Sequence, residues 1–427
     1  PLPENHLKKL LSWANSFGFC NIFYNNNISN YPFDPFNNLV AVGNRASPIA
    51  NQTFDALQTA IDKHKWLIGH FSYDLKNQIE KLSSNHTPSI DFPLLHFFEP
   101  ECLVHIKSDG LLIESDEAPK EVYDQICQTE YKVSMGHVGQ VNTNTSKQEY
   151  LNTVNKLLNH IIEGDVYEIN YCIEFLINHL ELDPVTFYLQ LCELSPTPFS
   201  FFYKINDKYA LGASPERFLK KENNKLISQP IKGTARRGVN HEEDEKIKQE
   251  LFNNEKERAE NMMIVDLVRN DLAKSAKSGT VKVEEMFGIY SYQHWHQMIS
   301  TVSAEISNGC DDISVVKNAF PMGSMTGAPK IKVMQLIEQY ETFRRGLYSG
   351  SIGYVKPNGE FDFNVVIRTL FYDSQAKNGA FMVGSAITSD AIPEKEYEEC
   401  LLKIKPILKA LAVHSGKESI DFSIKDY

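Results

Sequence analysis

The sequence predicts an α+β protein built around large antiparallel β-sheets. Segments with alternating apolar and polar residues indicate strands, and segments with apolar residues three and four positions apart indicate helices. The two kinds of segment are interleaved without strict β–α–β alternation, which favours antiparallel over parallel pairing. The chain has 427 residues, of which 42% are hydrophobic, so it carries enough apolar material for a large core.

The best-marked helix begins after Ser146. Ser146 and Glu149 have the spacing of a capping box, in which each side chain binds the other residue's backbone N–H. Apolar residues then recur at helical spacing until Gly164, which ends the helix. The same reasoning predicts long helices over residues 242–276, 330–339 and 393–411.

Residues 166–175 are predicted to form a strand with one polar face. Glu168, Asn170 and Cys172 alternate with apolar and aromatic residues, and successive side chains of a strand point to opposite faces. Shorter apolar runs predict further strands over residues 209–213, 349–355, 364–371 and 380–388.

A polar segment rich in Gly, Asn and Thr, residues 134–145, is the best candidate for a boundary within the chain. No internal repeat or low-complexity linker accompanies it. We therefore predict that residues 1–140 form the N-terminal part of the same globular unit, and that residues 141–427 form its main domain.

Charge and composition narrow the class of protein. The formal net charge of −12 repels phosphate backbones, so no nucleic-acid partner is expected. No apolar stretch reaches membrane-spanning length, so no membrane association is expected. The seven cysteines are scattered without metal-ligand or redox spacing, which indicates reduced thiols in a cytoplasmic protein. Signatures of dinucleotide-binding folds, P-loops, zinc proteases and serine hydrolases are missing from the sequence.

Two pairs of glutamates are candidate metal ligands. Glu257 and Glu260 lie three residues apart in one predicted helix, and Glu396 and Glu399 repeat this spacing in the last helix, with Lys403 one turn further. Residues three apart share a helix face. Two such faces could hold a hard divalent cation through oxygen, although the spacing alone favours solvated helix faces.

Three glycine-containing segments are candidate binding or catalytic sites. Residues 230–238 (PIKGTARRG) could bind a carboxylate, and Lys232 within them could act as a nucleophile, but a basic surface hairpin is the commoner explanation. Glu216 (GASPERF) is a candidate general acid, with an ion pair to Arg217 as the commoner alternative. Residues 323–330 (GSMTGAPK) could bind an anion at a helix N-terminus, or form only a loop.

Taken together and in this order, these segments resemble the chorismate-utilising enzymes. The resemblance runs from about Ser146 to the C-terminus, with a weaker match at residues 69–75 (GHFSYDL). It implies an α+β fold with two large antiparallel sheets packed together and flanked by helices, and it makes residues 141–427 a chorismate-binding catalytic domain. The motifs that carry it are SPTPFSFFY, GASPERF, QPIKGTARRG, KERAENMMIVDLVRNDL, GSMTGAPK, SIGYV, VVIRTL and EKEYEECLLK.

The resemblance also implies roles for single residues. Glu260 and Glu399 are expected to bind Mg²⁺, supported by Glu257 and Glu396, and Glu216 is expected to protonate the departing 4-hydroxyl. Arg368 is expected to bind the side-chain carboxylate of chorismate, because its planar fork suits carboxylates. The full set of expected chorismate contacts is Gly233, Thr234, Thr326, Tyr354, Arg368, Gly384, Ala386 and Lys403.

Lys232 distinguishes between the reactions of this family. Anthranilate and isochorismate-type enzymes resemble PIAGT or PLAGT here, whereas aminodeoxychorismate synthase component I resembles PIKGT, as this chain does. The resemblance implies that Lys232 attacks C2, that the C4 hydroxyl leaves, and that ammonia then adds at C4. Water-adding members place a lysine base where this chain has Glu168, and the amine-forming members usually have glutamine there.

This resemblance predicts 4-amino-4-deoxychorismate as the product, on the route to 4-aminobenzoate and folate. Ammonia is expected from a separate glutamine amidotransferase subunit. An anthranilate synthase component I and a non-catalytic chorismate-binding relative are the alternatives. The chain departs from the family at three positions. Gln297 stands in place of a histidine, and His296 lies one residue early. Ala386 replaces a glycine, and Asn261 replaces another histidine.

Overall fold

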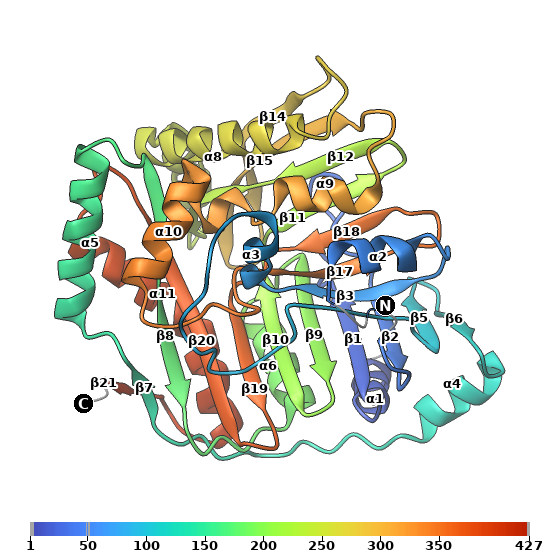
Figure 1. Ribbon diagram of the computed structural model, residues 1–427. Helices are drawn as coiled ribbons and strands as arrows, with labels where there is room; N and C mark the ends of the chain where they lie inside the picture. Colours follow the sequence, from blue (N-terminus) through green and yellow to red (C-terminus); the bar gives the residue numbers. More distant parts are fainter. Residues whose placement is uncertain (1–3, 48, 50–51, 425–427) are drawn as a thin grey trace.

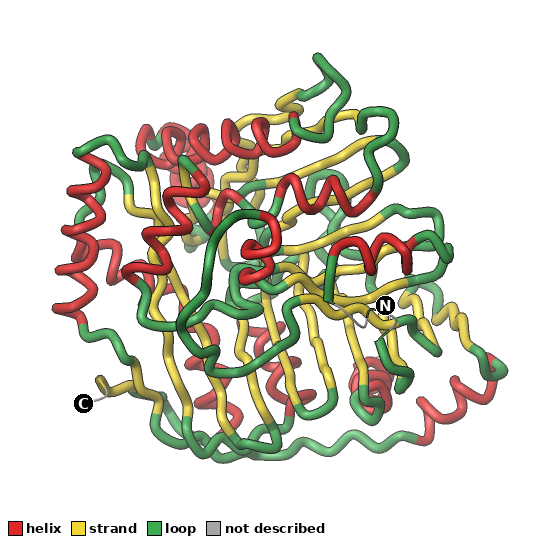
Figure 2. Tube along the Cα trace, viewed as in Figure 1, coloured by secondary structure: helices red, strands yellow, loops and turns green. Residues whose placement is uncertain are grey.

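The computed structural model describes residues 4–47, 49 and 52–424, and it confirms the predicted fold class (Figure 1). Two large, mostly antiparallel β-sheets lie in the interior with helices around them, as Figure 2 shows. In these residues the α-helices are α1 (Glu4–Ala14), α2 (Phe54–Ile61), α3 (Lys76–Ile79), α4 (Pro119–Gln128), α5 (Lys147–Ile162), α6 (Pro184–Leu194), α7 (His241–Asn253), α8 (Glu255–Ala273), α9 (Asp312–Ala319), α10 (Lys330–Tyr340) and α11 (Pro393–Ser415).

The first sheet has 12 strands within the described residues, and its order along the hydrogen-bonded path is β21-β7-β8-β20-β19-β10-β9-β1-β2-β5-β6, with β16 paired to β8. Only the β21–β7 pair in it is parallel. The strands are β1 (Phe19–Tyr24), β2 (Leu39–Gly43), β5 (Cys102–Ile106), β6 (Leu111–Ser115), β7 (Val141–Thr143), β8 (Glu168–Ile177), β9 (Phe199–Ile205), β10 (Lys208–Ser214), β16 (Gly327–Ala328), β19 (Thr369–Asp373), β20 (Asn378–Ile387) and β21 (Phe422–Ile424).

The second sheet has nine strands in the same part of the chain, in the order β13-β15-β12-β11-β18-β17-β3-β4, with β14 paired to β15. These strands are β3 (Leu67–Phe71), β4 (Leu95–Phe98), β11 (Arg217–Glu222), β12 (Lys225–Gln229), β13 (Ile231–Arg236), β14 (Lys282–Ser291), β15 (Trp295–Glu305), β17 (Ser351–Val355) and β18 (Phe361–Asn364).

Two hydrophobic clusters hold these layers together. One combines residues of both sheets, such as Phe71, Phe201 and Phe363, so it forms the core between them. The other combines the opposite side of the first sheet with residues of α5, α6 and α11, including Ile173 and Ile407. Because successive residues of a strand point to opposite faces, β8 turns its apolar residues to the helices and its polar ones inward.

The strongest local signal of the sequence is confirmed. The side chain of Ser146 accepts a hydrogen bond from the Glu149 backbone, and the reciprocal bond from the Ser146 backbone to Glu149 is also present, so α5 begins with a capping box. The predicted strands over residues 209–213 and 380–388 correspond to β10 and β20.

Two predicted elements are wrong in extent. The helix predicted over residues 242–276 is two helices, α7 and α8, because Asn254 caps the second by accepting a hydrogen bond from the Glu257 backbone. The strand predicted over residues 364–371 is divided between β18 in the second sheet and β19 in the first. The chain crosses between the sheets there, and Arg368 adopts the left-handed backbone conformation with φ of 51°.

The N-terminal part of the chain contributes to both sheets. Its strands β1 and β2 continue the first sheet next to β9, and β3 and β4 form one end of the second. The division predicted at residue 140 stays a prediction. All seven cysteines are free, and among the residues that the structure describes no helix has the length and apolar character needed to cross a membrane.

Candidate active site

One cavity of about 470 Å³ brings together nearly all the predicted site residues. It lies where the first turns of α8 and α11 meet strand β13 of the second sheet and strands β8 and β20 of the first. Its walls include Lys232, Glu216, Gly233, Thr234, Arg368, Gly384, Ala386, Lys403, Glu257, Glu260, Glu396 and Glu399, whereas Thr326 and Tyr354 are not among them.

The four glutamates come from the N-terminal ends of two helices that face each other. Glu257 lies in the first turn of α8 and Glu396 in the first turn of α11, where the positive end of a helix favours negative side chains. Burial raises the pKa of Glu260 to about 7, and it also raises the pKa of Glu257, with the charge of Glu399 as the second cause. The pair on α8 therefore disfavours ionisation until a cation arrives, whereas on α11 the pKa of Glu399 is lowered, because its burial is outweighed by the charges of Lys403 and other nearby lysines.

The donor chemistry of these glutamates suits a hard divalent cation, because all the available ligand atoms are carboxylate oxygens. Lys256 already occupies a cation position between the two helices. Its Nζ lies 3.6 Å from Glu260 Oε1 and 3.3 Å from Glu396 Oε1. A single positive group can therefore contact carboxylates of both helices.

Lys232 projects from β13 into the same cavity. Its Nζ donates a 2.8 Å hydrogen bond to Glu168 Oε1 on β8. Burial opposes the charged form, but the carboxylates of Glu168 and Glu260 raise the pKa of Lys232 above its usual value. The next residue, Gly233, has φ of 88°, and a Cβ there would lie 3.2 Å from Glu257. The glycine therefore allows β13 to pass close to α8.

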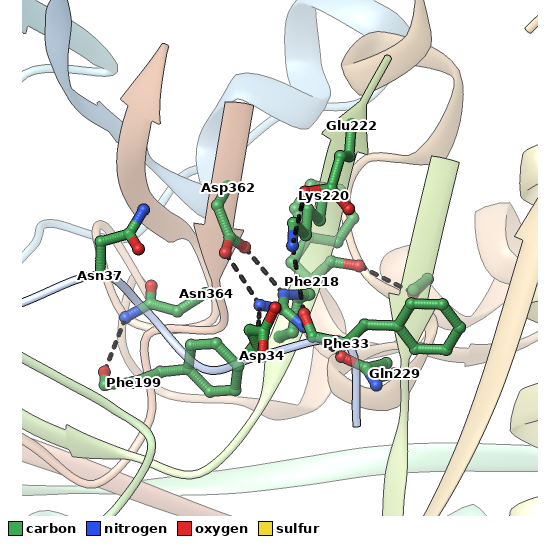
Figure 3. Close-up of polar contacts among 12 residues, drawn as sticks. Phe33, Asp34, Asn37, Phe199, Phe218, Lys220, Glu222, Gln229, Asp362 and Asn364 are labelled. Atoms are coloured by element: carbon green, nitrogen blue, oxygen red, sulfur yellow. Dashed lines mark hydrogen bonds and ion pairs between the residues drawn. The ribbon is translucent and has the colours of Figure 1, made fainter. Parts of the chain in front are cut away.

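Glu216 is directed to the cavity because its neighbour is bound elsewhere. The alternative ion pair between Glu216 and Arg217 is absent, since Arg217 donates to both oxygens of Asp362, at 2.8 and 2.9 Å. Arg217 also donates to the carbonyl of Asp34 and the side chain of Gln229. Figure 3 shows how Asp34, Gln229 and Asp362 lie close together. Adjacent residues of an extended chain face opposite ways, so Glu216 points into the site.

The environment of Glu216 suits a proton donor. Burial raises its pKa to about 7, although the nearby Ser324 hydroxyl and the charge of Lys232 lower it. A carboxyl group with this pKa is part protonated near neutral pH, which is the requirement for general acid catalysis there.

Arg368 is the best candidate for binding an anion. Burial lowers its pKa to about 10, and the nearby Glu216 opposes this shift. In the part of the chain that the structure describes, no carboxylate forms an ion pair with its guanidinium. A partly buried arginine without a partner favours an anionic ligand, since an uncompensated charge is costly to bury.

The other expected substrate contacts surround these groups. Lys403 forms an ion pair of 2.7 Å with Glu399 and donates to the carbonyl of Gly384 at 2.8 Å. A Cβ at Gly384 would lie 2.5 Å from Cys172 Sγ and 2.6 Å from Asn170 Oδ1, so the glycine lets β20 approach β8 closely.

Two of the expected contacts, Thr326 and Tyr354, do not line the cavity. Thr326 is buried, and its hydroxyl donates to the carbonyls of Met322 and Gly323 rather than to the cavity. Tyr354 packs in the core against Phe23, and its hydroxyl accepts a hydrogen bond from Asn37, because the register of β17 turns it away from the site.

A different tyrosine, Tyr348, lines the cavity six residues earlier. Tyr348 was not predicted as a contact, because nothing in the local sequence pattern distinguishes it from Tyr354. Asn170 was on the predicted polar face of β8 and could have been chosen from that alternation. Lining residues with polar or aromatic side chains that were not predicted as contacts also include Lys256, Trp295, Gln297 and Ser324.

The departures of this chain from the family also have positions in the structure. Gln297 faces the cavity, whereas His296 is buried on the other side of β15, where its Nε2 lies 3.0 Å from Asp244 Oδ1. Asn261 accepts a hydrogen bond from Ser300 behind the site. The anion site considered at residues 323–330 is not supported, because Lys330 donates inward to Asp271 and to loop carbonyls.

These features bring a buried arginine, a lysine, a carboxylic acid and two pairs of glutamates to one cavity. The chain matches the family of chorismate binding enzymes over residues 28–409. It belongs to that family and is a chorismate-utilising enzyme.

Relatives with two different names are similar to the chain. Anthranilate synthase component 1 of Aquifex aeolicus is 36% identical over 271 residues, which are 64% of this chain and 54% of that enzyme. Aminodeoxychorismate synthase component 1 of Bacillus subtilis is 32% identical over 372 residues, 83% of this chain and 78% of the relative. The solved structure of anthranilate synthase component I from Streptococcus pneumoniae shares the fold, with a TM-score of 0.74 at 24% identity and 91% of each chain covered.

Proposed function

We propose that this enzyme aminates chorismate at C4 to give 4-amino-4-deoxychorismate, on the route to 4-aminobenzoate and folate. The observation that carries the proposal is the position of Lys232, whose ammonium group enters the same cavity as Glu216 and the two glutamate pairs. The resemblance of this segment to the PIKGT form of the family supports C4 rather than C2 as the aminated carbon.

Substrate binding would use the charges around the cavity. Arg368 would bind the side-chain carboxylate of chorismate, and the backbone of Gly233, Thr234 and Gly384 would border the ring. Glu260 and Glu399 would hold Mg²⁺ with the support of Glu257 and Glu396. When bound, the ion would neutralise the ring carboxylate.

The first displacement would use Lys232 and Glu216. The ammonium of Lys232 first gives a proton to Glu168, the acceptor in contact with it. The resulting amine forms a bond to C2, the conjugated ring double bonds shift from C1–C2 and C5–C6 to C1–C6 and C4–C5, and the C4–O bond breaks. Glu216 donates its proton to the departing oxygen, which leaves as water.

The second displacement would reverse these movements. Ammonia forms a bond to C4, the double bonds return to C5–C6 and C1–C2, and the C2–N bond to Lys232 breaks. Glu216, now a carboxylate, accepts the proton released by the new amine. Two successive allylic displacements place nitrogen on the carbon that lost oxygen, and the net change is chorismate plus ammonia to the amino product plus water.

We propose a separate glutamine amidotransferase subunit as the source of ammonia, and a cytoplasmic location. A second candidate function is anthranilate synthesis, which is favoured by the names of several relatives. Lys232 argues against it. A non-catalytic chorismate-binding role is disfavoured, because both proposed catalytic side chains and all four glutamates line one cavity.

The deciding experiment incubates the purified chain with chorismate, Mg²⁺ and ammonium at pH 8 and identifies the product by liquid chromatography and mass spectrometry. We expect 4-amino-4-deoxychorismate. Anthranilate, isochorismate or no turnover would refute the proposal.

A mass measurement on quenched enzyme tests the covalent step. We expect an adduct on the wild-type protein that is absent from Lys232→Ala, together with loss of amination in that variant. Lys282→Ala, which changes an exposed strand lysine of the same sheet, should keep both the adduct and the activity. Full amination by Lys232→Ala would exclude the lysine as nucleophile.

A further inference from the structure

The first turn of α8 contains a lysine, Lys256, that no step of the proposed reaction uses. Lys256 precedes the first glutamate of its pair by one residue, and its side chain bridges to Glu396, 140 residues later in the chain. Its ammonium also lies 3.6 Å from Glu260 Oε1. Glu396 and Glu260 are nearly buried, with 3% and 11% of their side chains exposed, whereas Lys256 is 40% exposed.

The carboxylates around Lys256 are spread apart in this arrangement. Among the residues that the structure describes, no three of these four glutamates each have a carboxylate oxygen within 4.8 Å of the other two. Oxygen ligands of Mg²⁺ lie about 2.1 Å from the ion, so even those on opposite sides of one ion are no more than about 4.2 Å apart. The glutamates are therefore held around an ammonium group, at ion-pair distances, rather than in a metal-binding geometry.

An ammonium group and a divalent cation cannot share this position. Both are attracted by the same carboxylates, and they repel each other strongly at short range. The long side chain of Lys256 can turn out to solvent, because it begins at the exposed entrance of the cavity. The buried glutamates are restricted to their places on the two helices.

From these contacts we infer that Lys256 is an internal substitute cation, which holds α8 and α11 together in the metal-free protein and is displaced when Mg²⁺ binds. The inference rests on the proposed metal site and assigns it a regulator within the chain. Lys256 lowers the affinity for Mg²⁺, because the ion has to break two ion pairs before it can enter. In return it stabilises a pair of helix ends that would otherwise repel each other.

Isothermal titration of the full chain with MgCl₂ at pH 8, without substrate, tests this inference. We expect Lys256→Met to bind Mg²⁺ about tenfold more tightly than the wild type, a difference of about 1.4 kcal/mol. Lys256→Arg, which keeps the positive charge, should bind like the wild type. The matched control is Lys405→Met, which replaces an exposed lysine of α11. It should also leave the affinity for Mg²⁺ unchanged.

Thermal unfolding gives a second readout that needs no turnover. Without metal, Lys256→Met should unfold at a lower temperature than Lys405→Met, and saturating Mg²⁺ should raise its unfolding temperature by more than it raises that of the wild type. Affinity of Lys256→Met equal to or weaker than that of the wild type would overturn the inference, as would equal metal-free stability of the two variants.

A third variant separates this inference from the proposed metal site. Glu260→Gln should lose most of the Mg²⁺ affinity. If the wild type and Glu260→Gln bind the ion equally, or if neither binds it, the metal site itself is wrong and the inference is overturned with it. If Glu260→Gln loses binding while Lys256→Met matches the wild type, only the role of Lys256 is wrong.

Discussion

Replacement of Glu216 by glutamine should slow the reaction and stabilise the fold at the same time. Glu216 is 5% exposed, and burial raises its pKa from 4.5 to about 7. Glutamine has nearly the same shape and carries no charge, but it cannot donate a proton as a carboxylic acid does. A positioned general acid contributes a factor of about 10² to 10⁴, and we expect a loss of this size in kcat.

The effect on stability depends on pH, and its sign follows from the direction of the pKa shift. In the unfolded chain Glu216 ionises near 4.5, whereas in the folded protein it ionises near 7, so the native state holds a proton that the unfolded state has lost. Native stability from this group is therefore lost as pH rises from 4.5 to 7. The loss approaches about 3 kcal/mol above pH 7 and vanishes below pH 4.5.

Urea unfolding of the wild type and Glu216→Gln at pH 5 and pH 8 measures this difference. The variant should gain up to about 3 kcal/mol relative to the wild type at pH 8, and much less at pH 5. Glu222→Gln, at the exposed end of β11, should show no such pH dependence. A variant with wild-type kcat, or one equally destabilised at both pH values, would refute this account of Glu216.

Three further perturbations test other parts of the site. Arg368→Met should raise KM for chorismate at least tenfold in steady-state assays, since a charged hydrogen bond to a carboxylate contributes about 1.5 to 3 kcal/mol. An unchanged KM would show that Arg368 does not bind the substrate. Chelation of metal ions by EDTA should abolish turnover. Added Mg²⁺ should move the acidic limb of the pH–rate profile to lower pH, because the ion competes with the proton that Glu260 binds near pH 7. Arg217→Met should cost about 3 to 5 kcal/mol in urea unfolding, because it leaves Asp362 buried without its partner, and a cost below 1 kcal/mol would contradict this.

Local spacing was sufficient to place each glutamate pair on one helix face, but on its own it favoured solvated faces and a surface hairpin at Lys232, and only the resemblance to chorismate-utilising enzymes pointed to a site. Residues three apart share a helix face whatever the rest of the fold does. The break between α7 and α8 was also present in the sequence, since Asn254 followed by Glu257 is a capping pattern, but the continuous polar periodicity concealed it.

Contacts between distant segments could not be predicted in this way. Tyr348 and Tyr354 are six residues apart, and which of them reaches the cavity depends on the register of β17 and on the face of the second sheet that lies next to the site. In the same way, nothing local reveals that Arg217 pairs with Asp362 instead of Glu216. Both questions are decided by tertiary packing.

The balance of charge in the cavity supports the proposal that a metal ion helps an anionic substrate to bind. The lining contains more carboxylates than cations. Its acidic residues are Glu216, Glu257, Glu260, Glu396, Glu398 and Glu399, and its basic residues are Lys232, Lys256, Arg368 and Lys403. Two of the cations are already paired within this set, Lys256 with Glu260 and Glu396, and Lys403 with Glu399. A dicarboxylate entering with Arg368 as its only unpaired cation would be repelled by the remaining charges. A divalent ion at the glutamate pairs would offset much of the negative charge of that half of the cavity and offer a positive charge to the substrate, so binding of the ion and of the substrate should each strengthen the other.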